Sequence, residues 1–497
     1  MLPASSPLLA ATHVAQTCDV RAKVDCGIVG IDQQQCTAKG CCWLPVPSGS
    51  ADPWCFFKGD APSTTCFGLL PASFDDPPFD EHAIGRMAKY FLANLDVNST
   101  GAVIASPGAV PALPDDCPGG YRFHWMRDGA LSIQALMDTS NITGYGMGAI
   151  RPVVERYVAW VRDVTAGSDE PKWNISAAAP YAFGWCRPQT DGPPLRALSL
   201  LAAMDRFATV DAWALARADL DWVADGDHSV TRSCDLWEEG TDEPNLLWNR
   251  VVMRAALLRG AAAAAARGDA AAQAKYERAA KNKVADPWAD HVLPGGTLSE
   301  CPAIGQSQAC ADQGKSLDGV VILALVHAGA AATAVADPAS AAIARTVGAY
   351  NAAFCKAYPI NREGQPGILY GRYLRDKYGG DGGNPWVLIT AALANLLYRA
   401  ATSAAARSPS AEAADAWRAT FGASFGEATG SFPAAFVAAG DSVLRRLRSH
   451  VAPTDEDHLF EQIDKRKGSQ YNAKDLTWSY AEMLGALAQR RVALAVI

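Results

Sequence analysis

The stretch "RPQTDGPPLRALSL", residues 187–200, decides the fold class. Its first half is a polar loop that carries Arg187 and Asp191, and the run Asp–Gly–Pro–Pro is a start signal for a helix. Its second half is rich in leucine and alanine, which favour helix. The stretch therefore predicts a loop with charged side chains directly before an apolar helix.

Three further segments repeat this arrangement. "NPWVLITAALANLL" begins with Asn384 as a predicted N-cap and Pro385 at the first helical position, and "KDLTWSYAEMLGAL" has Asp475 as a predicted cap. "WMRDGALSIQAL", from Trp125, also leads into a helix. In a closed ring of helix pairs, alternate helices begin at the same end, so these loops are expected to meet around one pocket.

Helical periodicity dominates from about residue 79 onward, with few strand-like alternations. The segment 319–336 reaches about the minimum length of a membrane span, but it is rich in alanine and glycine and contains His327. We interpret it as a buried helix. The predicted helices are 79–95, 129–139, 145–164, 193–208, 211–224, 245–266, 269–283, 317–335, 339–356, 385–405, 432–449 and 475–495.

Tryptophans accompany these loops. A flat aromatic face with Arg, Asp or Gln beside it suits the apolar face and hydroxyl rim of a sugar, although any single tryptophan is better explained as core. Their shared position favours a sugar pocket. They are Trp125, Trp185, Trp237, Trp386 and Trp478.

Hydrolysis of a glycosidic bond needs two carboxyl groups, one protonated and one ionised. "SCDLWEEG", residues 233–240, supplies Glu238 and Glu239, and "FEQID" supplies Glu461 and Asp464. Isolated acidic pairs of this kind more often mark a solvated face or a helix end. The residues alone therefore leave both interpretations open.

The runs "YRFHWMRDGAL", "GWCRPQTDGPPLRA", "DLWEE", "GRYLRDKY…GNPW" and "EQIDK…AKDLTWSYAEML" stand in one order along the chain. Together they resemble the glucoamylases of glycoside hydrolase family 15, over residues 67–497. The resemblance implies an all-α fold, an (α/α)6 barrel. It also implies an inverting exo-hydrolase that removes glucose from the non-reducing ends of α-1,4-glucans, with β-D-glucose as product.

The same resemblance assigns roles. It makes Glu238 the general acid, Glu239 a substrate contact and Glu461 the general base. The remaining substrate-binding positions that it implies, together with Trp478 from the last loop, are Tyr121, Trp125, Arg127, Asp128, Trp185, Arg187, Asp191, Leu236, Trp237, Arg372, Tyr378 and Trp386.

Physical chemistry adds expectations about the two acids. Glu238 should be kept protonated by burial against apolar groups or by nearby carboxylates, and Glu461 should be ionised and face a water. Inversion leads us to expect a separation of about 6.5–9.5 Å between the two carboxyls. Arg127 and Arg372 are expected to bind hydroxyls, because a tight pair with Glu238 would remove its proton.

Two departures from the family pattern affect the pocket. The segment from Arg372 to Trp386 contains four glycines in "YGGDGGN", which suggests a flexible loop at the rim and leaves the role of Tyr378 open. Asn472 stands near the base where fungal members often carry serine, so the pH optimum is expected to differ.

The N-terminal segment "CDVRAKVDCGIVGIDQQQCTAKGCCWLPVPSGSADPWCFF" resembles a trefoil (P-type) domain. It is either a carbohydrate-binding accessory or a stable spacer. The expected organisation is a possible leader at 1–17, the trefoil at 18–57, a linker at 58–78 and the catalytic domain at 79–497. The resemblance implies the disulfides Cys18–Cys42, Cys26–Cys41 and Cys36–Cys55.

Seven cysteines remain outside the trefoil. Cys301 and Cys310 resemble a local bridge of fungal relatives, and Cys186 and Cys234 form a candidate pair. The pairing of Cys66, Cys117 and Cys355 stays open, and the odd number leaves at least one thiol free or intermolecular.

Thirteen cysteines and sequons at Asn98, Asn141 and Asn174 point to a secreted, extracellular chain. A net charge of −8 without a basic run argues against nucleic acid or an acidic membrane as partner. Metal and phosphate motifs are absent from the sequence, so we expect no metal, no cofactor and a monomer acting on an α-glucan or maltooligosaccharide.

Two alternatives remain open. One is a family 15 enzyme with another linkage specificity, of isomaltose or trehalose type. The other is a secreted glycan-binding protein with an inactive barrel, which the retention of both Glu238 and Glu461 disfavours.

Overall fold

A computed structural model describes most of the chain. The described residues are 18, 31–38, 41–45, 54–56, 66–70, 74–108, 120–228, 231–240, 245–303, 310, 312–361, 365–451 and 455–497. The possible leader at 1–17 and Cys26 and Cys117 lie outside them.

Within the described residues, six helices form a closed inner ring in the order α3, α5, α7, α10, α12, α15, with α15 packed against α3. Their side chains are buried on nearly every face, as expected for helices surrounded by other elements. The inner helices are α3 (Met126–Asp138), α5 (Gly192–Arg206), α7 (Leu247–Ala266), α10 (Val320–His327), α12 (Val387–Ala406) and α15 (Thr477–Leu494).

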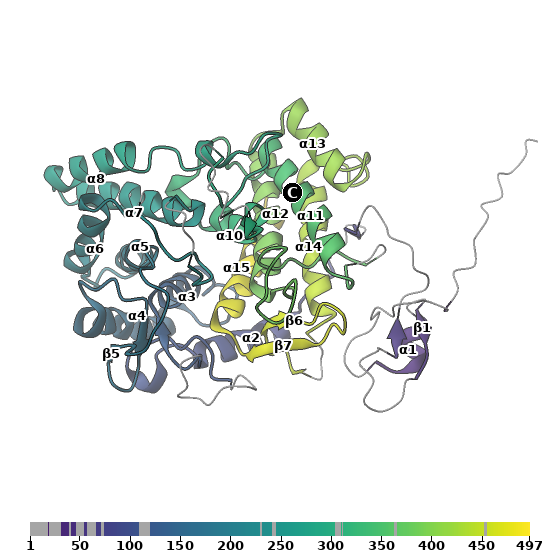
Figure 1. Cartoon of the computed structure of the whole chain (residues 1–497), viewed down its shortest axis with the longest axis horizontal. Coiled ribbons are helices and arrows are strands. Elements are labelled where there is room, and N and C mark those ends of the chain that lie inside the picture. The colour runs from purple at the N-terminus through teal and green to yellow at the C-terminus, as the bar shows by residue number, and fades with distance from the viewer. Residues whose placement is uncertain are drawn as a thin grey trace, which may run out of the picture.

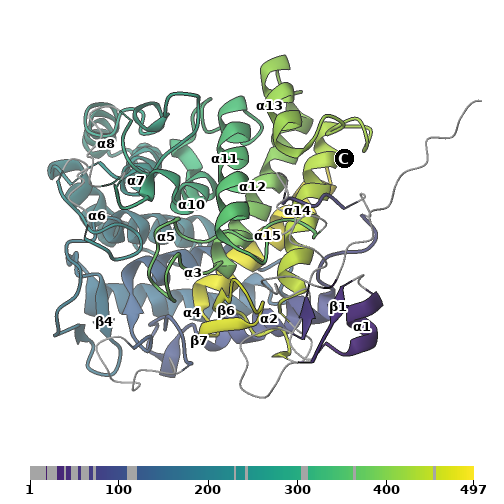
Figure 2. The ribbon, with the colours of Figure 1, turned by 45° about the vertical axis from the view of Figure 1, so that its right-hand side comes forward.

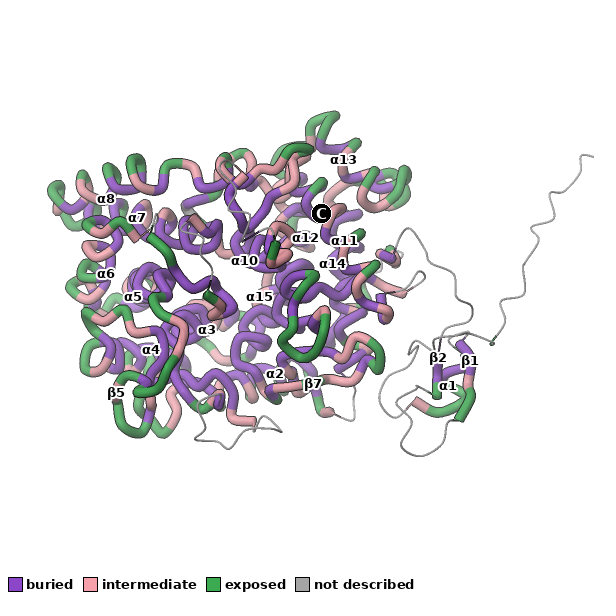
Figure 3. The backbone as a smooth tube through the Cα atoms, in the orientation of Figure 1, coloured by how far each residue is buried: buried purple, intermediate pink, exposed green. Residues whose placement is uncertain are grey.

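A second set of helices alternates with these along the chain and covers them from outside (Figure 1). Most of these helices bury one face and expose the other, so exposed segments, in green, lie along the outer edge of the molecule in Figure 3, whereas α14 is buried along most of its length. They are α2 (Glu81–Ala93), α4 (Met147–Trp160), α6 (Trp213–Asp225), α8 (Ala270–Asn282), α11 (Ala341–Ala357) and α14 (Phe432–Arg448). The predicted (α/α)6 barrel is therefore confirmed.

Short strands lie in the loops. One small antiparallel sheet consists of β3 (His124–Trp125), β4 (Lys172–Asn174) and β5 (Ala179–Pro180), with β4 in the middle. Figure 2 shows the hairpin of β6 (Phe460–Ile463) and β7 (Gln470–Lys474) beside the ends of α12 and α15. The helical periodicity of the sequence carried no signal for these strands.

An observed helix overlaps each predicted range, but some bounds differ. The range 317–335 holds only the eight residues of α10 and a short turn at Gly329–Ala331, because Gly329 adopts a positive φ of 49° that ends the helix. The helix α13 (Ala411–Phe421) was not predicted; it is short, and its one fully buried large side chain is Trp417.

Two predicted caps are wrong for a shared reason. α12 begins at Val387 and α15 at Thr477, so Trp386 and Leu476 occupy the N-cap positions. Asn384 instead bonds Gln462, and Asp475 bonds His458 and Tyr480. These polar side chains hold loops in place and do not cap helices.

The helix α12 is long enough and apolar enough to cross a membrane, but 83% of its 18-residue apolar window is buried inside the protein. Its hydrophobicity is explained by its place in the inner ring.

The described part of the N-terminal module contains α1 (Gln33–Ala38) and the antiparallel strands β1 (Cys42–Trp43) and β2 (Cys55–Phe56). Disulfides join Cys18 to Cys42 and Cys36 to Cys55, which are pairs that the resemblance implies. A buried sulfur cluster takes the place of a large core in this module.

Among the described residues of the helical part, three disulfides are present. Cys186 is bonded to Cys234 and Cys301 to Cys310, as the sequence suggested. The third joins Cys66 to Cys355 of α11, which the sequence left open. It ties the described residues 66–70, part of the predicted linker, to the barrel.

Candidate active site

A cavity of about 500 Å³ opens at the N-terminal ends of the inner helices. The loops that precede α3, α5, α7, α12 and α15 all contribute to it, as expected for a ring in which alternate helices begin at the same end. Its lining residues are Ala105, Tyr121, Trp125, Arg127, Asp128, Trp185, Leu236, Trp237, Glu238, Glu239, Arg372, Tyr378, Gly379, Trp386, Leu388, Glu461, Tyr471, Asn472, Leu476 and Trp478.

A tight turn presents Glu238 and Glu239. The carboxylate of Asp235 accepts hydrogen bonds from the backbone N–H groups of Trp237 (3.0 Å) and Glu239 (2.9 Å). Glu238 has a positive φ of 64°, a conformation that is uncommon outside glycine and often found at functional sites. The turn is thus neither helix nor strand, and it directs the two neighbouring glutamates to different partners.

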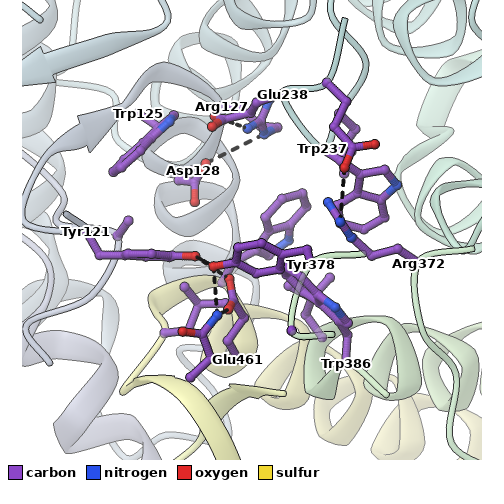
Figure 4. A pocket seen from close by; sticks show the side chains of 18 of the residues that line it. Tyr121, Trp125, Arg127, Asp128, Trp237, Glu238, Arg372, Tyr378, Trp386 and Glu461 are labelled. Atoms are coloured by element: carbon purple, nitrogen blue, oxygen red, sulfur yellow. Dashed lines mark hydrogen bonds and ion pairs between the residues drawn. The ribbon is translucent and has the colours of Figure 1, made fainter. Parts of the chain in front are cut away.

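Glu238 lies beside Arg127 of the first turn of α3. The Nη2 atom of Arg127 donates to Oε1 of Glu238 at 3.0 Å (Figure 4). The expectation that Arg127 leaves the acid unpaired is therefore wrong, whereas its binding of hydroxyls stays a prediction. Arg127 also forms ion pairs with Asp191 at 3.2 Å and Asp128 at 3.6 Å, so one guanidinium is paired with three carboxyl groups.

The positive charge of Arg127 does not cancel the effect of burial on the pKa of Glu238. Burial raises the pKa of Glu238 above its ordinary value, against the opposing charges of Arg127 and Lys172. Burial also raises the pKa of Asp128 to about 7, with Arg127 acting against it. Glu238 therefore keeps its proton to a higher pH than a free glutamate does, even though an arginine touches it.

Glu239 has a different environment. Its carboxylate accepts from Nζ of Lys315 at 2.7 Å and from the hydroxyl of Tyr373 at 2.6 Å, and it lies 3.1 Å from Nη2 of Arg372. Burial acts to raise the pKa of Glu239, but Arg372 and Lys315 outweigh it and lower that pKa. Glu239 is held as an anion, which makes it unsuited to donate a proton.

Glu461 lies on β6, on the other side of the pocket from Glu238 in Figure 4. The hydroxyl of Tyr121 donates to its Oε1 at 2.7 Å, and the amide of Asn472 donates to its Oε2. Asn472 also donates to the hydroxyl of Tyr378 at 2.7 Å. These donors favour the ionised carboxylate.

Burial nevertheless raises the pKa of Glu461 to about 7, against the hydrogen bond from Tyr121, the charge of Arg372 and the hydrogen bond from Asn472. We expected surroundings that simply favour the anion. The structure instead sets a large desolvation effect against a set of donors, so each donor has a direct influence on ionisation.

Asn472→Ala should therefore move the acid limb of the pH profile of kcat/KM to higher pH by about one unit. A shift of this size corresponds to the loss of one hydrogen bond to a charged group. Loss of the amide donor disfavours the anion of Glu461 and raises its pKa. The measurement is kcat/KM on maltose against pH. Asn472→Ser keeps a donor and should move the limb less; an acid limb at the same pH in all three proteins would contradict this role.

Two sequence-predicted residues do not line the pocket. Arg187 forms an ion pair with Glu170 at 2.6 Å and binds the carbonyl of Trp185 at 3.2 Å, so it holds the loop that carries this tryptophan. Asp191 contacts Arg127 and accepts from the indole of Trp248 at 2.8 Å. Both act through neighbours that do reach the cavity.

The glycine-rich segment after Tyr378 is held by several bonds. The backbone N–H of Tyr378 donates to Asp376 at 2.8 Å, and Asp376 is itself paired with Arg372. Gly379 has a φ of 82°, and a Cβ atom there would lie 2.5 Å from the amide oxygen of Gln462. Glycine is required at this position because the loop must pass close to β6.

Several residues that shape the site were not predicted. Lys172 and Lys315 are buried behind the pocket wall, and Tyr471 lies at its rim. Lysine is normally a surface residue, so neither lysine carried a signal in the sequence. Their burial is only evident once the loops are folded.

Some tryptophans of the pocket wall have indole nitrogens without a hydrogen-bond partner. Among the described residues, three buried indole nitrogens from pocket-lining tryptophans have no acceptor, namely those of Trp125, Trp185 and Trp386. Buried donors normally find partners, so these three indoles are exceptions within the wall of the cavity.

The chain is similar to several known glucoamylases. Glucoamylase-1 of Schizophyllum commune is 28% identical over 446 residues, covering 80% of this chain and 71% of its own length. Glucoamylase 1 of Rhizopus oryzae is 29% identical over 442 residues, covering 82% and 69%. The solved glycoside hydrolase family 15 glucoamylase from Hypocrea jecorina superposes with a TM-score of 0.70 at 25% identity, covering 85% of this chain and 73% of that one.

Family models match both parts of the chain. Residues 16–58 match the trefoil (P-type) domain, and residues 85–488 match the glycosyl hydrolases family 15. The second match covers most of the sequence. The chain is therefore a glycoside hydrolase that belongs to glycosyl hydrolase family 15 and carries an N-terminal trefoil domain.

Proposed function

We propose that the protein is an exo-acting, inverting glucan 1,4-α-glucosidase that releases β-D-glucose from the non-reducing ends of starch-like α-glucans. The observation that carries this proposal is the placement of two carboxyl groups, those of the half-buried Glu238 and the buried Glu461, on opposite sides of one cavity (Figure 4). An inverting hydrolase needs an acid on one side of the sugar and a base on the other.

In this scheme, Glu238 donates its proton to the glycosidic oxygen as the bond from C1 to that oxygen breaks. Glu461 takes a proton from the water whose oxygen forms the new bond to C1 on the opposite face. The acid ends as a carboxylate and the base as a carboxylic acid, so one proton crosses the site in each turnover. Exchange with solvent restores both groups.

Substrate binding follows from the remaining lining groups. Arg127 and Asp128 offer a charged donor and acceptor at the start of α3, and the tryptophans offer flat faces. The inner ring beneath the pocket is filled by side chains such as the fully buried Trp248. A glucan is thus expected to insert a chain end, which favours exo action.

The product anomer tests this proposal. Hydrolysis of maltotriose followed by proton NMR should show β-glucose first, with α-glucose appearing only through mutarotation. Inversion requires this result because water attacks the face opposite the leaving group. Initial α-glucose, or no glucose, would overturn the proposal, and parallel reactions with isomaltose and trehalose would detect a different linkage preference.

The compartment and partners extend the proposal. The disulfides indicate an oxidising compartment, and we infer that the chain is secreted and acts as a monomer, since residues of one chain complete the pocket.

In the trefoil, Trp54 is 49% exposed and its ring meets that of Trp43 edge to face, with 5.8 Å between the ring centres. This aromatic pair supports a carbohydrate-binding role for the module.

A further inference from the structure

A fully buried lysine lies behind the pocket. Lys172 is on β4, directly opposite Trp125 of β3 in the sheet register. Four aromatic rings surround its ammonium group. The Nζ atom lies 3.6 Å from the ring centre of Trp185, 4.2 Å from Tyr181, 4.3 Å from Trp125 and 4.5 Å from Phe123.

Such a cage compensates for the loss of water around the charge. The faces of aromatic rings carry negative potential, and a desolvated cation gains about 2 kcal/mol or more from a well-placed ring. The rings also contact one another, with Trp125 and Trp185 at 6.0 Å and Phe123 and Tyr181 at 5.0 Å between centres. The ammonium therefore stands at the centre of a packed aromatic cluster.

Two walls of this cage are also walls of the pocket. Trp125 and Trp185 line the cavity that contains Glu238, whereas Phe123 and Tyr181 lie outside it. Lys172 thus lies behind a part of the wall of the cavity that Glu238 also lines.

Charged and titratable groups among the described residues act on this lysine. Glu238 attracts it and Arg187 repels it, while Arg187 is itself paired with Glu170. Tyr181 is the titratable member of the cage. Burial lowers the pKa of Lys172 to about 7, with Glu238 acting in the opposite direction, so the group is cationic in acidic solution.

We propose that Lys172 is a positioning residue, whose caged ammonium braces the Trp125–Trp185 wall and, in acidic solution, places a positive charge behind the pocket wall beside the general acid. This inference rests on the proposed role of Glu238. The cation favours release of the acid's proton to the substrate, and it balances burial, which acts to retain that proton.

Lys172→Met is the direct test, because methionine keeps the length of the side chain and packs well on aromatic rings. Without the cation, Glu238 should hold its proton more strongly, so the alkaline limb of kcat/KM on maltose should move up by roughly half to one pH unit. KM should rise several-fold as the wall loosens. Lys275→Met, on the outer helix α8, removes an equal charge and should change neither quantity.

A second variant keeps the test independent of any folding defect in the first. Phe123→Leu removes one ring that does not line the pocket, which weakens the cage and should move the alkaline limb in the same direction by a smaller amount. Circular dichroism and thermal unfolding establish that each variant is folded. An alkaline limb that stays in place or moves down in both folded variants would overturn the inference.

A wrong assignment of the general acid in the proposed function would give a different experimental result from a wrong role for Lys172. If Glu238 is not the acid, the alkaline limb should persist in the residual activity of Glu238→Gln. That outcome would reject the assignment of the acid, whereas an unmoved limb in Lys172→Met alongside a lost limb in Glu238→Gln would reject only the role of the lysine.

Discussion

Glu238→Gln is expected to lower kcat on maltose by about 10³-fold or more, since general acid catalysis contributes roughly 10²–10⁴-fold. The amide keeps the size of the side chain and can still contact Arg127, so the substrate site should survive. What it lacks is a proton acidic enough to assist the leaving oxygen. Steady-state kinetics on maltose measures the loss.

The leaving group provides a sharper readout. α-Glucosyl fluoride needs little protonation, because fluoride departs readily by itself. Glu238→Gln should therefore hydrolyse this substrate far better, relative to the unaltered protein, than it hydrolyses maltose. Equal losses on both substrates would show that Glu238 does not act as the acid.

Glu239→Gln is the matched control, with the same chemical change one residue further along the chain. Glu239 is bound by Lys315, Arg372 and Tyr373, so its loss should disturb the binding wall and raise KM more than it lowers kcat. If this variant lost all turnover with an unchanged KM, the two roles would have to be exchanged.

Glu461→Gln is expected to produce a loss of similar size, about 10³-fold in kcat, for the opposite reason. The amide cannot accept the proton of the attacking water. Since this step is needed for every substrate, α-glucosyl fluoride and maltose should be affected alike. This pattern separates the base from the acid.

Azide tests the assignment directly, because it attacks C1 without giving up a proton. Azide should accelerate reaction of α-glucosyl fluoride by Glu461→Gln and yield β-glucosyl azide. The control Glu456→Gln alters an exposed acid of the preceding loop and should leave all rates unchanged. Absence of azide rescue together with normal substrate binding would contradict the role of Glu461.

The helices could be predicted because their signals are local. Alanine- and leucine-rich periodic segments mark both rings of the barrel, and every predicted range overlaps an observed helix. Errors occur where tertiary contacts outweigh local preference. Asn384 and Asp475 have the side chains of caps, but bonds to β6 and to His458 hold them elsewhere.

The lining of the pocket was predicted in large part, but the partners of its acids were not. Arg127 and Glu238 stand 111 residues apart, and their ion pair contradicts our expectation that the arginine leaves the acid unpaired. The positive φ of Glu238 and the burial of Lys172 and Lys315 also had no signal in the sequence. Such features arise from loops of different helices that meet at one end of the ring.

The sequence by itself determined the helices, the two family resemblances and the pair of glutamates, since these depend on residue types at short spacing. Only the tertiary structure decided how the charges are shared. One guanidinium divides among three carboxyl groups, two cations hold Glu239 as an anion, and burial opposes the donors around Glu461. Desolvation and Coulomb energy depend on distances between side chains, and those distances exist only in the folded chain.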